Sequence, residues 1–348
     1  SGSGISSGGA LRSVGGTNTY AGAVTLAADS RINTDSGSLL TISGAIDNGG
    51  KVMTVGGAGD SSLTGVISGS GSLTKDGSGT VTLTQSNTYT GITTLQAGIL
   101  AITGDSNLGT NPSSATPGKL VFTGGTLSTT GDFELGSNRG VLLTSAGTIR
   151  TVSGTLTYSG IMDGSGLFTK EGTGTLVLSG SNTHSGGTTI SAGTLTASNP
   201  LALGSTGNVS MAAGVTLAST VDLSIGSGRN VVLAGDNPIL ETGSGTTLTV
   251  GAGILDGSGT YGFIKSGSGT LTLTASNSYD GSTTVSAGVL RVSNDSALGS
   301  TLGGVTVLSG AALELSGGTL TIGNETLTLS GSGISNDGAL RSVGGTNT

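Results

Sequence analysis

A motif that recurs at a constant interval constrains this chain more than any other feature, because tandem self-similarity decides how a chain can fold. The segment that begins at Lys75 returns at Lys170 and again at Lys265, each time 95 residues further on. Each copy holds a lysine and then Asn-x-Tyr/His-x-Gly, and it continues into Ala-Gly and Leu-Gly pairs. We interpret the recurring positions as structural positions of a repeat: Lys75, Asn87, Tyr89, Gly91, Lys170, Asn182, His184, Gly186, Lys265, Asn277, Tyr279 and Gly281.

A longer period encloses these copies. Residues 1–19 recur as residues 330–348, displaced by 329 residues, and 17 of the 19 positions are identical. We therefore expect residues 1–348 to form one continuous solenoid, a window of a tandem array with a 329-residue period. The predicted internal repeats are approximately 69–163, 164–256 and 257–329, and residues 330–348 begin the next unit.

Short alternating segments lie within each copy and predict half-buried β-strands. Examples are 80–84, 175–178 and 270–274, where Thr alternates with aliphatic residues and Gly-rich turns lie on both sides. No stripe with helical spacing is present. Sandwiches and propellers also use short strands, but tandem repetition favours a parallel β-helix, an all-β β-solenoid with essentially no helix. Outward Thr and Ser should form ladders, and because aromatic residues make up only 3% of the chain, aliphatic residues alone should fill the core.

The composition excludes several classes of protein. The chain has 69 Gly in 348 residues, which is typical of disorder, yet its mean hydropathy of +0.21 opposes disorder. It has no Cys, so disulfides and thiolate metal sites are excluded. The net charge is −7 and no basic run exists, so nucleic-acid binding is not expected. No apolar stretch is long enough for a transmembrane helix, and the first residues lack the pattern of a signal peptide.

Possible catalytic motifs are weak. Gly59-Asp60-Ser61 and Gly104-Asp105-Ser106 resemble the start of a serine-nucleophile motif, which needs a histidine base. The single histidine, His184, occupies the position that Tyr89 and Tyr279 fill in the other copies. A protease is therefore not expected.

Other candidate sites have simpler explanations. Asp236 and Glu241 are the nearest acidic neighbours, but we expect isolated, solvated acids in turns. A match to the dinucleotide fingerprint at 257–262 is expected by chance in so Gly-rich a chain. The three lysines are interpreted as exposed cations near turn acids such as Asp76 and Glu171. We predict no cofactor, no resident metal and no enzymatic activity.

The repeated motif resembles passenger domains of autotransporters, and more narrowly their passenger-associated transport repeat. The matching stretches run from Gly69 to Leu83, from Gly164 to Leu178 and from Gly257 to Leu273. This resemblance implies a right-handed parallel β-helix that is exported through the outer membrane, with a role as adhesin, stalk or scaffold. It implies no catalytic residue, and the family's translocator barrel is not in this chain.

The function expected from these features is a structural and adhesive extracellular rod of a secreted bacterial surface protein, which mediates surface attachment or cell–cell contact. A self-assembling filament or sheath subunit is the alternative, and a β-helical polysaccharide-active enzyme is a third. Expected partners are other copies of the chain, end to end or side by side, and a host, cell-surface or glycan ligand. The expected location is the exterior of the outer membrane, which the chain contacts only through the translocator.

Overall fold

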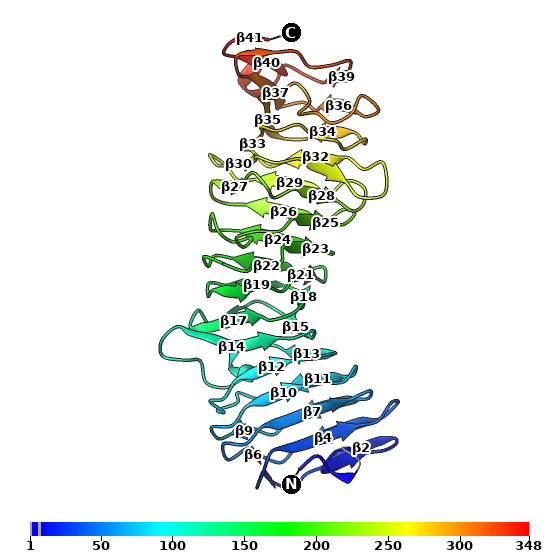
Figure 1. Cartoon of the computed structure of the whole chain (residues 1–348), viewed down its shortest axis with the longest axis vertical. Helices are drawn as coiled ribbons and strands as arrows, with labels where there is room; N and C mark the ends of the chain where they lie inside the picture. Colours follow the sequence, from blue (N-terminus) through cyan, green and yellow to red (C-terminus); the bar gives the residue numbers. More distant parts are fainter. Residues whose placement is uncertain (1, 6–7, 348) are drawn as a thin grey trace. The chain divides into compact units, whose positions relative to one another are not determined.

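A computed structural model of the chain describes residues 2–5 and 8–347. It contains two compact units, Ser1–Gly174 with Asn182–Ser185 (unit 1) and Thr175–Ser181 with Gly186–Thr348 (unit 2). In each unit short strands stack turn over turn as parallel ladders (Figure 1). The prediction of an all-β parallel solenoid is confirmed.

Unit 1 is built from two long parallel ladders and two short ones. The first long ladder is β1 (Leu11–Ser13), β4 (Ser30–Thr34), β7 (Met53–Gly57), β10 (Leu73–Lys75), β12 (Thr93–Leu95), β14 (Thr116–Phe122), β17 (Arg139–Leu143) and β20 (Met162–Gly164). The second is β2 (Thr17–Tyr20), β5 (Leu39–Ile42), β8 (Asp60–Leu63), β11 (Thr80–Leu83), β13 (Ile99–Ile102), β15 (Thr126–Thr130), β18 (Gly147–Ser153) and β21 (Phe168–Glu171). The short ladders are β3 (Val24–Thr25), β6 (Ile46–Asp47) and β9 (Ile67–Ser68), and β16 (Phe133–Leu135) with β19 (Thr155–Tyr158).

Unit 2 repeats this construction with three longer ladders and one short pair. One ladder is β22 (Thr175–Leu178), β24 (Thr194–Ala197), β26 (Thr216–Ser219), β29 (Ile239–Thr242), β32 (Phe263–Ser266), β34 (Thr283–Val285), β36 (Gly304–Val307) and β39 (Thr326–Leu329). Another is β23 (Thr188–Ile190), β25 (Val209–Met211), β28 (Val231–Leu233) and β31 (Ile254–Asp256). The third is β27 (Leu223–Ile225), β30 (Thr247–Val250), β33 (Thr270–Leu273), β35 (Gly288–Val292), β37 (Ala311–Ser316) and β40 (Leu340–Val343), and the short pair is β38 (Thr319–Leu320) with β41 (Thr346–Asn347).

Helical structure is confined to single turns. Across residues 2–5 and 8–347 the named helical elements are two 3₁₀ segments, η2 (Asp105–Leu108) and η3 (Ile334–Asn336). Repeated Gly and β-branched residues favour strands and turns over helix, which agrees with this outcome.

The strands alternate buried and half-buried residues, as the sequence pattern predicts. In β11, for instance, Val81 and Leu83 are buried while Thr80 and Thr82 are half-buried. Threonines at successive turns lie in register, such as Thr54, Thr74 and Thr94, so the expected outward ladders form.

The expectation of a purely aliphatic core is wrong. Six of the nine aromatic residues are fully buried: Phe122, Phe168, Phe263, Tyr89, Tyr158 and Tyr279. Aromatic residues are rare in the sequence because one ring per several turns suffices, not because the core excludes them.

Candidate functional site

The three repeated lysines lie inside the solenoid. Lys75, Lys170 and Lys265 are each at most 1% exposed. The Nζ of Lys75 donates to the carbonyl oxygens of Asp76 (2.6 Å), Gly77 (2.8 Å) and Ala97 (3.0 Å). An ammonium has three N–H donors, and three carbonyls accept them. We call this arrangement the lysine knot.

The third copy reproduces the lysine knot. Lys265 Nζ donates to the carbonyls of Ser266 (2.5 Å), Gly267 (2.7 Å) and Ala287 (3.0 Å). In the second copy, Lys170 Nζ donates to the carbonyls of Glu171 (2.9 Å) and Gly172 (2.8 Å). The recurring Ala-Gly pair thus has a role, because its carbonyl joins one turn to the lysine of the turn before it.

The interpretation of these lysines as exposed cations beside turn acids is therefore wrong. Lys75 lies two residues after the buried Leu73, so strand alternation directs its side chain into the core. Asp76 instead pairs with Arg31, and Glu171 pairs with Arg150 at 2.8 Å. Burial lowers the pKa of Lys75, Lys170 and Lys265 to about 8, and nearby acids such as Asp76, Glu171 and Glu241 offset this only in part.

The repeated asparagines join successive turns. Asn87 accepts the Ile67 N–H at 2.8 Å through Oδ1 and donates to the Asn107 carbonyl at 2.6 Å through Nδ2. Asn277 likewise accepts the Ile254 N–H at 2.7 Å and donates to the Ala297 carbonyl. Asn182 accepts the Met162 N–H at 2.9 Å. Each of these side chains is buried, so its amide replaces ladder hydrogen bonds where the strand stops.

The aromatic position of the motif lies in the core. The hydroxyls of Tyr89 and Tyr279 share hydrogen bonds with Thr93 (2.7 Å) and Thr283 (2.6 Å). Burial raises the pKa of Tyr89 to about 12 and also raises that of Tyr279. His184 fills the same position, is fully buried, and meets the Phe168 ring edge-on with centroids 6.0 Å apart. A buried imidazole packed on a ring has no access to substrate.

The glycine that ends the motif allows two turns to approach closely. A Cβ on Gly91 would collide with the backbone of Gly71, and one on Gly281 would collide with the backbone of Gly262. Gly186 lies in the loop before β23. The repeated glycines at the first and third copies are thus required by backbone packing.

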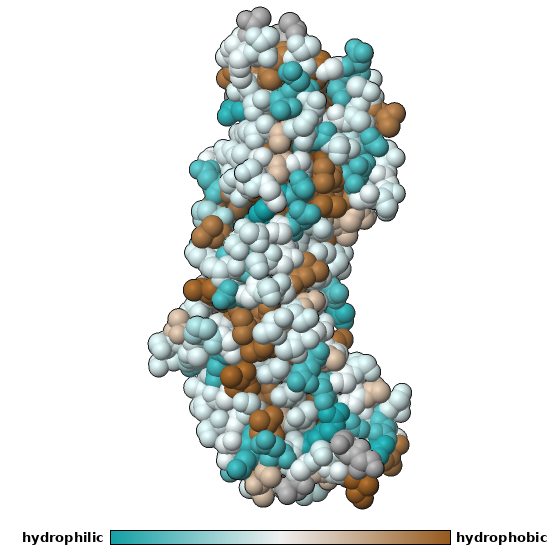
Figure 2. Space-filling view, in the orientation of Figure 1, coloured by the Kyte–Doolittle hydropathy of each residue, from teal (hydrophilic) through white to brown (hydrophobic). Residues whose placement is uncertain are grey.

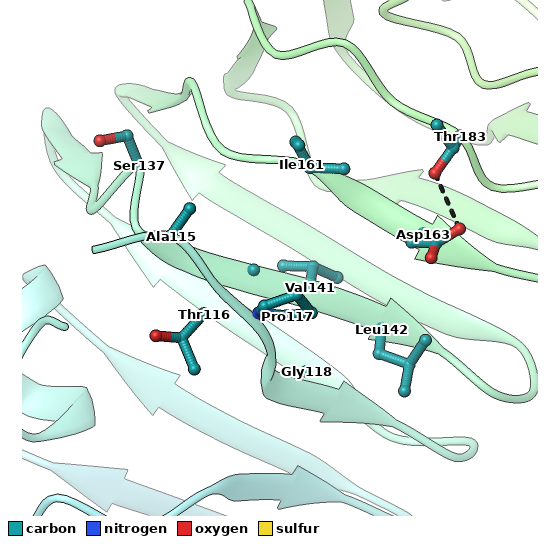
Figure 3. A pocket seen from close by; sticks show the side chains of 11 residues that line it. Ala115, Thr116, Pro117, Gly118, Ser137, Val141, Leu142, Ile161, Asp163 and Thr183 are labelled. Atoms are coloured by element: carbon teal, nitrogen blue, oxygen red, sulfur yellow. Dashed lines mark hydrogen bonds between the residues drawn. The ribbon is translucent and has the colours of Figure 1, made fainter.

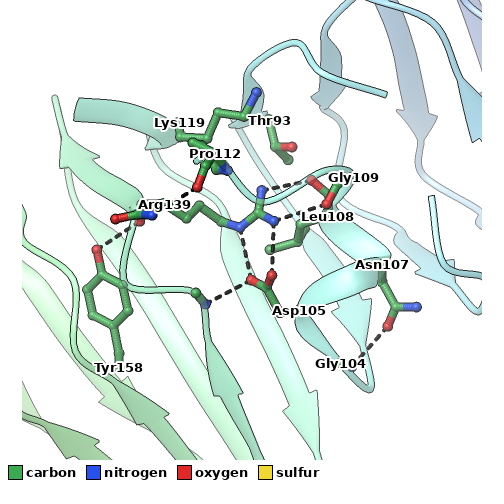
Figure 4. A network of polar contacts seen from close by, with 12 residues as sticks. Thr93, Gly104, Asp105, Asn107, Leu108, Gly109, Pro112, Lys119, Arg139 and Tyr158 are labelled. Carbon is green, nitrogen blue, oxygen red and sulfur yellow. Dashed lines mark hydrogen bonds and ion pairs between the residues drawn. The ribbon is translucent and has the colours of Figure 1, made fainter. Parts of the chain in front are cut away.

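A buried arginine that sequence reasoning missed organises the end of the first copy (Figure 4). Arg139 is fully buried, and its guanidinium donates to the Asp105 carboxylate at 3.0 and 3.2 Å. It also donates to the carbonyls of Leu108 (2.9 Å) and Gly109 (3.1 Å). Asp105 accepts the Gly136 N–H as well, at 3.0 Å. The Asp105 carboxylate therefore stabilises a turn and is not part of a nucleophile motif.

The second copy has an equivalent arginine and the third does not. Arg229 donates to the carbonyls of Leu203 (2.9 Å) and Gly204 (2.9 Å), which form the second Leu-Gly pair. In the third copy the same register position holds Glu325, whose Oε2 is buried and has no hydrogen-bond partner. Each of the three lies two residues before a residue with an equivalent partner on the preceding turn. Arg139 precedes Val141 (opposite Leu120), Arg229 precedes Val231 (opposite Val209), and Glu325 precedes Leu327 (opposite Val305).

An apolar groove of about 400 Å³ lies on unit 1 (Figure 3). One wall is the segment 115–118, where β14 changes register, and the other holds Val141, Leu142 and Ile161. Ile161 is 50% exposed. At one end the Thr183 hydroxyl donates to Asp163 at 2.7 Å, which lowers the pKa of that carboxyl. The space-filling view shows apolar side chains gathered over β14 and β17 (Figure 2).

The remaining catalytic candidates do not assemble into a site. Ser61 is buried, and its hydroxyl shares a 2.7 Å hydrogen bond with Thr34 rather than with a base. Asp236 lies in the turn after β28 and Glu241 lies in β29, and both carboxylates are exposed. Within residues 2–5 and 8–347, no group of three His, Cys, Asp or Glu residues could hold a metal ion. No helix in that part of the chain is long and apolar enough to cross a membrane.

Comparison with known proteins identifies the class to which the repeats belong. The family model described as Passenger-associated-transport-repeat matches residues 73–102, 168–197 and 263–292. Each match begins 95 residues after the last and contains one lysine and one Asn-x-Tyr/His-x-Gly. The chain is therefore a β-solenoid that carries three passenger-associated transport repeats, and the resemblance to autotransporter passengers is confirmed.

One curated protein supports this class. The Adhesin BmaC autotransporter of Brucella suis biovar 1 (strain 1330) is 36% identical over 113 residues, which cover 32% of this chain. The match spans 3% of that protein's own length, so the chain corresponds to a small part of this relative. No solved structure matches the chain significantly.

Proposed function

We propose that this chain is an adhesive and structural part of an autotransporter passenger displayed on the outside of a bacterial cell. The three passenger-associated transport repeats carry this proposal, and the similarity to a protein named as an adhesin supports it. The buried polar groups point the same way, because the repeated lysines and asparagines, and Arg139, hydrogen-bond to backbone groups of the solenoid. None of them is presented to a substrate.

The outer surface offers two means of contact with a target. Half-buried Thr and Ser columns provide hydroxyl groups at every turn, as in Thr54, Thr74 and Thr94. The groove beside Ile161 provides apolar area that water leaves when a target binds. We propose that host surfaces, other cells or glycans are held by these features, without turnover.

A bead assay tests adhesion. Beads coated with the 348-residue chain should bind target cells, and Ile161→Asp should lower the number of bound beads by about fivefold or more, as loss of a central apolar contact does. Leu302→Asp is the matched control, because Leu302 is 78% exposed and does not line the groove. Equal loss in both variants argues against the groove. The adhesive proposal would be overturned in favour of an enzyme by two results together. The beads would bind no cells, and the chain would cleave a polysaccharide with an activity that Asp236→Asn and Glu241→Gln abolish.

Display on the cell is tested separately. Antibodies against the chain should label intact bacteria, and external protease should remove that label without lysis. Labelling that requires permeabilised cells would contradict surface display.

A further inference from the structure

The strongest unassigned feature is a segment that occurs twice, with a different edge paired each time. Residues 2–19 and 331–348 are near-identical in sequence. Their local folds agree as well: Gly9 N–H donates to Ser3 O at 2.7 Å, and Gly338 N–H donates to Ser332 O at 2.9 Å. The second hydrogen bond of the turn also recurs, from Gly8 to Ile5 (2.9 Å) and from Asp337 to Ile334 (3.1 Å). The two hydrogen bonds thus recur although the second copy has Asn336 and Asp337 where the first has Ser7 and Gly8.

The strand after this turn is paired along opposite edges in the two copies, so the edge that is paired in one copy is unpaired in the other. In the first copy, β1 pairs with the strand that follows it, with Leu11 opposite Ile32 in β4. In the second copy, β40 pairs with the strand that precedes it, with Leu340 opposite Leu313 in β37. The same residues therefore have a defined partner on each side. The unpaired edge of β40, opposite β37, corresponds to the edge through which β1 pairs with β4.

The open edge at β40 is apolar. Leu340 and Val343 are each 43% exposed. Leu329, in the last strand of the neighbouring ladder (β39), is 45% exposed. Leu340 also lines a cavity of about 180 Å³ together with Leu313 and Leu327. An unpaired apolar strand edge is a template for another strand. In register, Leu340 would be covered by a residue equivalent to Ile32.

The charges beside β40 indicate that the segment that pairs with it must contain an acidic residue. Glu314 lies between Arg291 (2.7 Å) and Arg341 (2.6 Å). The Nε of Arg341 is buried and has no hydrogen-bond partner. Its counterpart in the first copy, Arg12, donates through Nε to Asp35 at 3.0 Å. A guanidinium has five N–H donors, so one arginine can serve Glu314 on one side and an Asp35 on the other.

We propose that the edge formed by residues 330–347 binds residues 30–47 of a second copy of this repeating unit, with the two ladders continuing without a break. Arg341 then bridges Glu314 of one copy and Asp35 of the next, and Leu340 packs between Leu313 and the next Ile32. The register of the junction follows the first copy, where Arg12 lies opposite Asn33 and its guanidinium reaches Asp35 two residues further on. A shift by one residue would move Leu340 away from the next Ile32 and displace Asp35 from Arg341. This inference concerns assembly and does not depend on the proposed adhesive function.

Hydrogen exchange on a lengthened chain tests the proposal. A further copy of residues 20–348 is appended after residue 348, and exchange is followed by mass spectrometry of proteolytic peptides. The reporter is the amide of Ala339, because its counterpart Ala10 donates to Arg31 O at 2.7 Å. The junction peptide continues into Tyr20, whereas the terminal peptide ends at residue 348, so the two are distinguished by mass. Exchange at the junction should be slowed by about tenfold or more relative to the terminal peptide.

Matched variants test the bridge itself. Asp35→Asn in the second copy should return exchange at the junction toward that of the terminal peptide by about threefold or more, because Arg341 loses a partner. Asp35→Asn in the first copy is the control, since its partner Arg12 is largely exposed and a surface pair contributes little. Protection of Val305 to Val307 in all variants shows that the solenoid has folded. Equal exchange in the junction and terminal peptides of such a folded chain would overturn the proposal.

Discussion

The Leu-Gly turn of the first copy and that of the third copy have the same place in the repeat but opposite electrostatics. At Leu108-Gly109, the Arg139 guanidinium donates to both carbonyls and is neutralised by Asp105. At Leu298-Gly299, the equivalent position holds Glu325, a group with acceptors only when ionised. The lysine knot, in contrast, is kept in all three copies. The difference shows that the knot is a fixed part of the repeat, whereas the polar group at the Leu-Gly turn can vary.

Replacing the buried arginine should produce the largest effect. Arg139→Met leaves the Asp105 carboxylate with only the Gly136 N–H and two carbonyls without the guanidinium, and we expect the free energy of unfolding to fall by about 3 kcal/mol. Urea denaturation measures this change. Arg229→Met is the comparison, since Arg229 serves carbonyls alone and its loss should cost less. Equal losses in the two variants would mean that Asp105 contributes nothing.

Removing a lysine knot should have a smaller effect that is similar in the first and third copies. Lys75→Met and Lys265→Met each remove the ammonium donor from three carbonyls, and each should lower the free energy of unfolding by about 2 kcal/mol. Urea denaturation of both variants gives the comparison. A loss at only one of the two positions would contradict a common structural role.

Giving the third copy the arginine of the other two should stabilise it. In Glu325→Arg the new guanidinium can donate to the carbonyls of Leu298 and Gly299, and we expect a gain of about 1 kcal/mol. Exchange of the Ser300 amide, which donates to Tyr279 O at 2.9 Å, reports on this turn. The Thr110 amide occupies the same place in the first copy and serves as the reference. Faster exchange at Ser300 in the variant would show that the position does not accept an arginine.

The smallest expected effect is a pH dependence confined to the third copy. Burial raises the pKa of Glu325 above its usual 4.5. The stability linked to this carboxyl is therefore fully present below pH 4.5 and is lost as the pH rises through the folded pKa. Urea midpoints measured across that range should decline less steeply with rising pH in Glu325→Gln. Unchanged pH profiles would place this carboxylate in solvent.

The sequence predicted the parts of the fold that depend on local pattern. The 95-residue spacing and the alternation in segments such as 80–84 were sufficient for parallel strands in tandem turns. Strand alternation could also have predicted that Lys75 is buried, because it lies two residues after the buried Leu73. Its charge and its position beside Asp76 favoured the surface instead. The structure corrects this because a carbonyl cage can bury an ammonium.

The Arg139 network could not be read from the sequence in the same way. Its partner Asp105 lies 34 residues away, and the number of residues per turn increases around the loop that precedes β14. Only the stacked turns bring the two groups together. That the twelve repeated positions are structural stays a prediction, which Lys75→Met and Lys265→Met test at two of them.

The close approach of backbones at Gly91 has a consequence for how such a surface changes over generations. Positions such as Gly91, where a side chain would collide with backbone, cannot be substituted. An outward residue such as Thr74 instead lies beside another threonine, Thr94, on the next turn. Outward substitutions away from special contacts typically alter stability by no more than about 0.5 kcal/mol. The outward columns can therefore change in sequence while the coil beneath them stays the same.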